Sequence, residues 1–172
     1  MNSSSFFADR GYSTARAVMV EIANGWTPVL AADLDGDGKS DLVWKHTNGS
    51  IGIWMVNGTT IASYNVMLGP NSGWSVQGVG DLDGDGKSDI VLVHTSGAVG
   101  GWIMNGPTVA SYGAIGSPGW TPVTLEDLDG DGADDIVWKD AGSSYAASLM
   151  NGLTARSTAS LVAGGSGWNV FP

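Results

Sequence analysis

The sequence contains no cysteine, few basic residues and no long apolar run, and each absence excludes a class of protein. Without cysteine, no disulfide can stabilise the fold, and cysteine usage says nothing about the redox compartment. No run of about 18 apolar residues is present, so we expect no membrane insertion. With 7 Lys and Arg in 172 residues, no basic patch forms, and nucleic acid is not an expected partner.

Signals for secretion and catalysis are missing as well. Residues 1–5 lack a basic start followed by an apolar stretch, so no signal peptide is indicated. The sequence has no Gly-x-Ser-x-Gly elbow, no cysteine nucleophile and no His-Glu-x-x-His motif. Because no paired acid and base accompanies a nucleophile, we expect that the protein is not an enzyme.

What the sequence does contain is an acidic segment, Asp-Leu-Asp-Gly-Asp-Gly-x-x-Asp, which recurs at residues 33–41, 81–89 and 127–135. Four carboxylates this close repel one another unless a cation lies among them. Calcium takes six to eight oxygen ligands, and alternate aspartates in a tight loop can point toward one ion. Position 7 varies freely, as expected of a residue that offers only its backbone carbonyl. The predicted ligands of three Ca²⁺ ions per chain are Asp33, Asp35, Asp37, Lys39, Asp41; Asp81, Asp83, Asp85, Lys87, Asp89; Asp127, Asp129, Asp131, Ala133 and Asp135.

Other interpretations of the acidic segments fit less well. An EF-hand requires a bidentate Glu at position 12 and flanking helices, but that position is Trp44, Leu92 or Trp138 here. Magnesium demands strict octahedral geometry and keeps its waters. A solvated acidic turn without an ion remains the alternative, and three matching copies disfavour it. All ligands come from one short loop, so we expect structural sites in which the ion clamps a hairpin and stabilises the fold.

A longer repeat surrounds each acidic segment. Each unit begins at a Gly-Trp pair and contains four short apolar runs separated by tight turns such as Asn57-Gly58. Four antiparallel strands in a repeat of about 40–50 residues are typical of a β-propeller blade. The sequence therefore predicts one all-β propeller domain over residues 1–172. Its predicted parts are a partial blade (1–25), three complete blades (26–73, 74–119, 120–167) and a closing strand (168–172).

The predicted strands fall one short of a closed four-bladed ring. Either the chain closes alone with one poor blade, or chains pool their blades in a larger ring. Exposed strand edges are templates for pairing, so we favour a homo-oligomer that completes the propeller.

Residues 80–91, Gly-Asp-Leu-Asp-Gly-Asp-Gly-Lys-Ser-Asp-Ile-Val, resemble the FG-GAP/VCBS-type repeat of integrin alpha-subunit propellers and of many bacterial and fungal surface proteins. The resemblance extends over about residues 26–166. It implies a calcium-stabilised propeller, extracellular or at the cell surface, that serves recognition. Some relatives with a Gly-Gly-Trp repeat start are fungal lectins that hold sugars between adjacent blades.

Aromatic and polar residues at repeated positions are the candidate ligand contacts. The tryptophans that open the units, Trp26, Trp74, Trp120 and Trp168, are expected to pack between blades. Trp54 and Trp102, on third strands, either pack or offer stacking surfaces to a sugar. His46 and His94 occupy equivalent strand-end turns, where they are either solvated or polar ligand contacts. The predicted function is carbohydrate recognition at clefts between blades. The alternative is a structural or adhesion propeller that assembles with a surface protein and has no small ligand.

Overall fold

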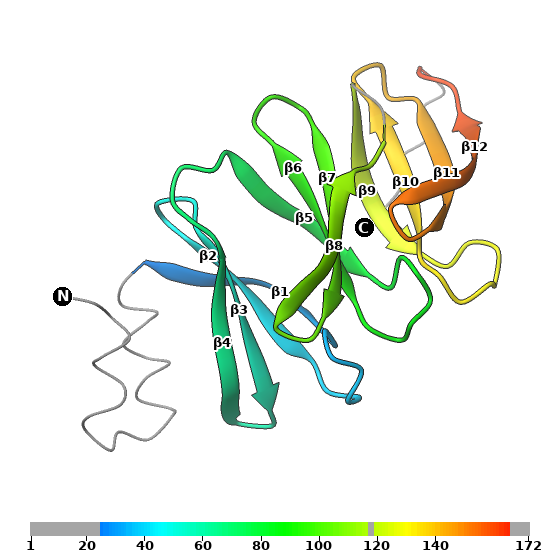
Figure 1. Ribbon diagram of the computed structural model, residues 1–172. Helices are drawn as coiled ribbons and strands as arrows, with labels where there is room; N and C mark the ends of the chain where they lie inside the picture. Colours follow the sequence, from blue (N-terminus) through cyan, green and yellow to red (C-terminus); the bar gives the residue numbers. More distant parts are fainter. Residues whose placement is uncertain (1–24, 117–118, 166–172) are drawn as a thin grey trace, which may run out of the picture.

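The computed structural model describes residues 25–116 and 119–165, which form twelve β-strands and no helix. They build three four-stranded antiparallel sheets, called blades 1 to 3 below (Figure 1). Blade 1 consists of β1 (Trp26–Ala32), β2 (Asp41–His46), β3 (Ile51–Asn57) and β4 (Thr60–Leu68). Blade 2 consists of β5 (Trp74–Gly80), β6 (Asp89–His94), β7 (Val99–Asn105) and β8 (Thr108–Ala114). Blade 3 consists of β9 (Trp120–Glu126), β10 (Asp135–Asp140), β11 (Tyr145–Asn151) and β12 (Thr154–Val162).

The predicted all-β class and the four antiparallel strands per unit are confirmed. Figure 1 shows the three blades fanned side by side in sequence order, with blade 2 in the middle. The predicted partial blade and closing strand lie outside the described residues, apart from Gly25. Within the described part of the chain, no helix is long and apolar enough to cross a membrane.

Turn chemistry explains why consecutive strands pair. Asn57 pairs with Thr60 across a two-residue turn that begins with Gly58 at φ 63°. Glycine at the first central position of a tight hairpin permits this left-handed conformation. The same geometry recurs at Gly106 (φ 59°) and Gly152 (φ 59°), so each β3–β4-type hairpin closes in the same register.

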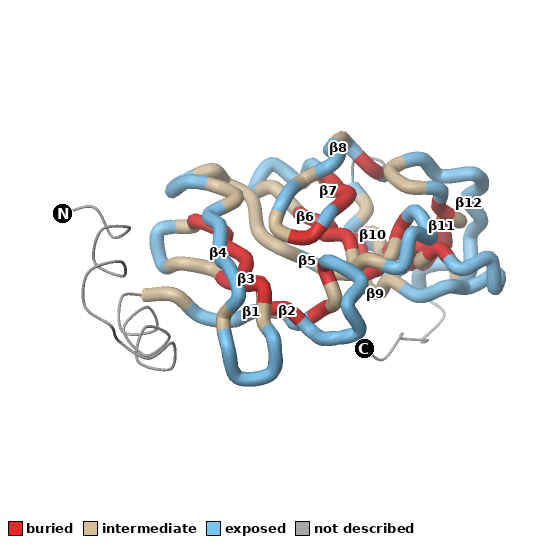
Figure 2. Tube along the Cα trace, turned by 60° about the horizontal axis from the view of Figure 1, so that its bottom comes forward, coloured by how far each residue is buried: buried red, intermediate tan, exposed pale blue. Residues whose placement is uncertain are grey.

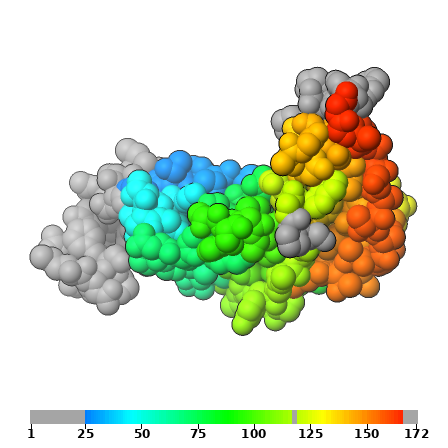
Figure 3. Space-filling view, turned by 90° about the horizontal axis from the view of Figure 1, so that it is seen from above, coloured from blue at the N-terminus to red at the C-terminus, as the bar shows by residue number. Residues whose placement is uncertain are grey.

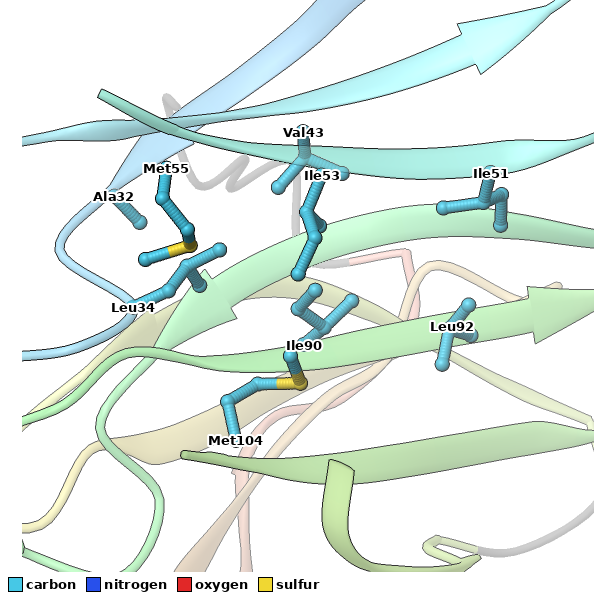
Figure 4. Close-up of a cluster of buried hydrophobic side chains, with 9 residues drawn as sticks. All are labelled: Ala32, Leu34, Val43, Ile51, Ile53, Met55, Ile90, Leu92 and Met104. Carbon is cyan, nitrogen blue, oxygen red and sulfur yellow. The ribbon is translucent and has the colours of Figure 1, made fainter. Parts of the chain in front are cut away.

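The hydrophobic core lies in the two seams between blades, where each sheet presents alternate side chains to its two neighbours. The seam between blades 1 and 2 contains Leu34, Ile53 and Ile90, all fully buried (Figure 4). The seam between blades 2 and 3 contains Leu82 and Ile136 at equivalent positions. Figure 2 shows these buried segments along the inside of the sheets, with exposed turns around them.

The first strands of adjacent blades approach closely, as the glycines of β5 indicate. A Cβ added at Gly78 would lie 2.7 Å from Leu125 Cδ1, and one added at Gly80 would collide with the Asp134 carboxylate. Glycine at these two positions leaves the room that side chains of blade 3 occupy. The narrow side of the fan is therefore built by β1, β5 and β9.

Candidate functional site

Each acidic loop connects the first and second strands of a blade and curls around its first aspartate. In loop 1, Asp33 accepts hydrogen bonds from the backbone N–H groups of Gly36 (2.7 Å), Asp37 (3.2 Å) and Gly38 (2.8 Å). Gly36 and Gly38 adopt φ values of 76° and 81°, which favour glycine. Asp81 and Asp127 organise loops 2 and 3 in the same way.

The curl gathers carboxylate oxygens into three clusters in which one oxygen of each residue lies within 4.8 Å of the others. The clusters are Asp33, Asp35 and Asp37; Asp81, Asp83 and Asp85; and Asp127, Asp129 and Asp135. The donors are hard carboxylate oxygens on partly exposed loops, which is the ligand type that Ca²⁺ or Mg²⁺ accepts. The residues present therefore fit a hard divalent cation at each loop.

The ninth position of each loop is a buried carboxylate that also ties the loop to the third strand. Asp89 is fully buried, and its two oxygens accept hydrogen bonds from Leu82 N (2.9 Å) and Met104 N (2.8 Å). Asp41 and Asp135 make the equivalent pairs of bonds. These aspartates fix the loop against its sheet, and at Asp135 one oxygen also reaches the acidic cluster.

A basic side chain lies on the carboxylate at the fifth position of every loop. Lys39 Nζ donates to Asp37 at 2.6 Å, and Lys87 Nζ donates to Asp85 at 2.5 Å. The third loop has Ala133 at that position, and the basic group comes instead from Arg156 on β12. The Arg156 guanidinium contacts Asp131 Oδ2 at 2.5 Å and Asp129 Oδ2 at 3.1 Å. Loop 3 is therefore the only one of the three described loops whose counter-ion is donated by a distant strand.

Burial and hydrogen bonding move the carboxyl pKa values of the loops in opposite directions. Burial raises the pKa of Asp89 to about 7, against the lowering effect of its two backbone N–H donors. The hydrogen bond from Lys39 lowers the pKa of Asp37, and that from Lys87 lowers the pKa of Asp85. Backbone N–H groups lower the pKa of Asp127. A cation in the cluster would favour the ionised form of every member.

The acidic loops also join neighbouring blades, which the hairpin-clamp interpretation did not foresee. Ser88 N, in loop 2, donates to Asp33 O at 2.7 Å, and Asp134 N, in loop 3, donates to Asp81 O at 2.5 Å. The turn glycine of the next blade donates to the following carbonyl, with Gly106 N 2.9 Å from Leu34 O. Ordering an acidic loop therefore stabilises the seam as well as its own hairpin.

A separate feature is an apolar cleft of about 710 Å³ between blades 1 and 2. One wall carries Trp74, Trp102 and Tyr112, and the other carries Met67 and Leu68. Trp102 and Tyr112 are cross-strand partners on β7 and β8, and the Tyr112 side chain is 80% exposed. The cleft thus offers aromatic faces that are open to solvent.

The equivalent place between blades 2 and 3 is filled. Trp138, buried to 3% exposure, stands where blade 2 has Leu92, and its indole N–H donates to Ser148 Oγ at 2.9 Å. Ser148 in turn bonds Thr158 Oγ1 at 2.8 Å, so hydroxyls replace the aromatic pair of blade 2. A Cβ added at Gly116 would lie 2.5 Å from the Trp138 ring, so the ring packs directly against this backbone.

The structure brings Trp102 into the cleft but not the other candidate ligand residues. Trp54 is buried and packs against Trp44, with ring centroids 4.1 Å apart. His46 and His94 lie at strand-end turns beside the unit-opening tryptophans, 5.1 Å between ring centroids in each case. The His94 ring also bonds Ser96 Oγ at 2.8 Å, which is a turn-forming contact.

Tyr112 and Arg156 were not predicted as functional residues. The repeated Ser-Tyr pair on fourth strands, at Tyr64 and Tyr112, was a signal for the first. Arg156 carried a weaker signal, because it is the basic residue at a position that is Ala62 or Ala110 in the other units.

Comparison with protein families identifies residues 81–138 as an FG-GAP-like repeat. The matched segment begins at the second acidic loop, includes β6 to β9 and the third acidic loop, and ends within β10. The recognition made from residues 80–91 is thereby confirmed. No curated protein sequence matches the chain. An FG-GAP-like repeat indicates a β-propeller-like recognition module, and the three acidic clusters are able to hold metal ions.

Proposed function

We propose that this chain is a calcium-stabilised recognition module, not an enzyme, that binds carbohydrate in the cleft between blades 1 and 2. The observation that carries the proposal is the open cleft lined by Trp74, Trp102 and Tyr112. Aromatic faces stack on the apolar C–H face of a sugar ring, and burial of that face is favourable in water.

Calcium would be held by the clustered aspartates of each loop, with the backbone carbonyls of Lys39, Lys87 and Ala133 as further donors. When bound, the ion supplies positive charge that relieves carboxylate repulsion. The protein positions the carboxylates through the N–H bonds to Asp33, Asp81 and Asp127 and through the buried ninth aspartates. We propose three such ions per chain and an extracellular or cell-surface location, where millimolar calcium suits sites of modest affinity.

The calcium part is tested by heating. Thermal unfolding in calcium is expected at a higher temperature than in a chelator, because an ion that binds only the folded chain stabilises it by mass action. Magnesium at the same concentration is the matched comparison. Equal melting temperatures with and without calcium, together with no calcium by elemental analysis, would contradict calcium stabilisation.

The carbohydrate part is tested on a glycan array in calcium buffer, followed by titration calorimetry with the best sugar. Tyr112→Ala should weaken binding roughly tenfold through the lost stacking surface, and leave the melting temperature almost unchanged because the side chain is exposed. Tyr64→Ala is the matched control, since Tyr64 occupies the same strand position on blade 1 and does not line the cleft. A blank array, or equal affinity of the Tyr112 and Tyr64 variants, would count against the cleft as a sugar site.

A further inference from the structure

One leucine occupies equivalent positions in the three acidic loops, and its burial differs sharply. Leu34 and Leu82 are 0% exposed, whereas Leu128 is 47% exposed. Leu34 packs in the seam between blades 1 and 2, and Leu82 packs in the seam between blades 2 and 3. A large apolar side chain that is fully buried in two copies and half exposed in the third marks a surface that no described residue of the chain covers.

The backbone around this leucine shows the same difference. Leu34 O accepts from Gly106 N at 2.9 Å, and Leu82 O accepts from Gly152 N at 2.8 Å. The preceding carbonyls, of Asp33 and Asp81, accept from the next acidic loop. Within residues 25–116 and 119–165, no donor reaches the carbonyls of Asp127 or Leu128. The acceptor half of a third seam is thus present on blade 3.

The donor half of such a seam is present on blade 1. Gly58 corresponds to Gly106 and Gly152, but it is exposed, and a Cβ added there would meet nothing within 4 Å. At Gly106 the same Cβ would lie 3.4 Å from Asp35 Cβ. Ser40 corresponds to the donors Ser88 and Asp134 and is also exposed. Figure 3 shows blade 1 and blade 3 at opposite ends of the described part of the molecule.

We propose that the third acidic loop of one chain docks on blade 1 of a second copy, and so repeats the seam that joins blades within the chain. Leu128 enters the position of Leu34 and Leu82, and Leu128 O accepts from Gly58 N of the other copy. Each chain has one acceptor end and one donor end, so the contact is heterologous and head-to-tail. Two copies satisfy all ends only by closing a ring. The proposal is independent of sugar binding, because the cleft between blades 1 and 2 is not part of the contact.

Sedimentation velocity of the full chain in calcium buffer, over a wide concentration range, tests the association. The wild-type chain is expected to form a dimer. Leu128→Asp should raise the dimer dissociation constant roughly tenfold or more, because a charge would be buried unpaired. Leu161→Asp is the matched control, since Leu161 is 53% exposed on β12, and it should dimerise like wild type. Both variants should melt at similar temperatures at concentrations where the chain is monomeric.

A mixing experiment tests the head-to-tail geometry. Gly58→Asn places a side chain at the donor end, at a positive φ that Asn accepts better than most residues. It should also weaken dimerisation. Mixed with Leu128→Asp, it should associate more tightly than either variant alone, because the mixture retains one intact contact per pair. A monomeric wild type, equal effects of Leu128→Asp and Leu161→Asp, or a mixture no tighter than its components would each overturn the proposal.

Discussion

The two seams of this molecule are built from the same repeat, and yet a place that is filled in one of them is an open cleft in the other. Between blades 2 and 3, Trp138 packs against the backbone of Gly116. Between blades 1 and 2, the equivalent residues are Leu92 and Leu68, and an aromatic-lined cleft remains. The backbone hydrogen bonds by which the acidic loops join the blades are the same in both seams. The geometry that the two seams share therefore comes from the acidic loops, whereas the side chains in the outer part of the seam differ between the two.

The narrow side of the fan thus provides stability, and the wide side is the part available for recognition. The narrow side of the fan is held by buried leucines, buried aspartates and backbone bonds, which leave little room for substitution. On the wide side, the aromatic cross-strand pair of blade 2, Trp102 and Tyr112, is replaced in blade 3 by the hydroxyl pair Ser148 and Thr158. Leu92 of blade 2 is likewise replaced by Trp138 in blade 3. A repeat of this kind can change the side chains on its wide side without a change in how its blades are joined.

The largest expected effect comes from truncating the leucine that both seams bury. Leu34→Ala and Leu82→Ala should each lower the free energy of unfolding by about 2–5 kcal/mol, because each leaves a cavity in a fully buried site. Leu128→Ala should change it by no more than about 0.5 kcal/mol, because its side chain is half exposed. Urea unfolding of the three variants at low protein concentration measures this. Clearly different losses at Leu34 and Leu82 would refute the equivalence of the two seams, and a loss at Leu128 as large as theirs would contradict the exposure of the third loop.

A second expected effect concerns Asp89, which lies in the blade that both seams share. Because the folded state holds the Asp89 proton up to a pKa of about 7, while an unfolded Asp has a pKa near 3.9, protonation favours the folded state. In calcium-free buffer this stability is present below about pH 4 and is lost as the pH rises to about 7.

The urea midpoint measured at pH 5 and at pH 7.5 tests this pH dependence, with Asp89→Asn as the comparison. The variant should show a smaller fall in midpoint, because its amide does not ionise. Burial also raises the pKa values of Asp41 and Asp134. These two residues therefore lower the stability with rising pH in the wild type and in the variant alike. An unchanged fall in the variant would show that Asp89 is not the group responsible.

Most of the fold was predictable from local patterns, and the contacts between blades were not. Gly-Trp starts, Asn-Gly turns and the acidic segments each act within a few residues, so their spacing predicted strands, hairpins and loops. Trp54 and Trp102 occupy the same strand position, but Trp54 packs against Trp44 of its own blade, whereas Trp102 lies with Leu92 in the lining of a cleft. The N–H of Gly106 and the carbonyl of Leu34 are backbone atoms that carry no sequence signal. Arg156 reaches Asp129 across 27 positions of sequence, which no local pattern encodes.

A third, smaller effect should follow from filling the open seam. Leu92→Trp introduces the residue of the filled seam opposite Leu68, and the extra volume should destabilise the chain by about 1–3 kcal/mol. Adding Leu68→Gly, which imitates Gly116, should recover part of that loss, so the two changes couple in a double-mutant cycle. Sugar affinity, where the array identifies a ligand, should fall in both variants. Additive losses, with no recovery in the double variant, would show that these two positions do not determine which seam is open.

The smallest expected effect distinguishes the third loop from the first two. Arg156 is partly exposed, so Arg156→Ala should cost at most about 1 kcal/mol of stability in calcium-free buffer. Its guanidinium lies on Asp131 and Asp129, where it competes with a divalent ion for the same oxygens. Removing it should therefore raise the calcium affinity of the third site and leave the first two sites, which keep Lys39 and Lys87, unchanged. Calcium titration followed by calorimetry measures this, with Lys45→Ala as the control, because Lys45 bonds Ser75 and no loop carboxylate. An unchanged titration curve would mean that Arg156 stabilises the loop without competing for its ion.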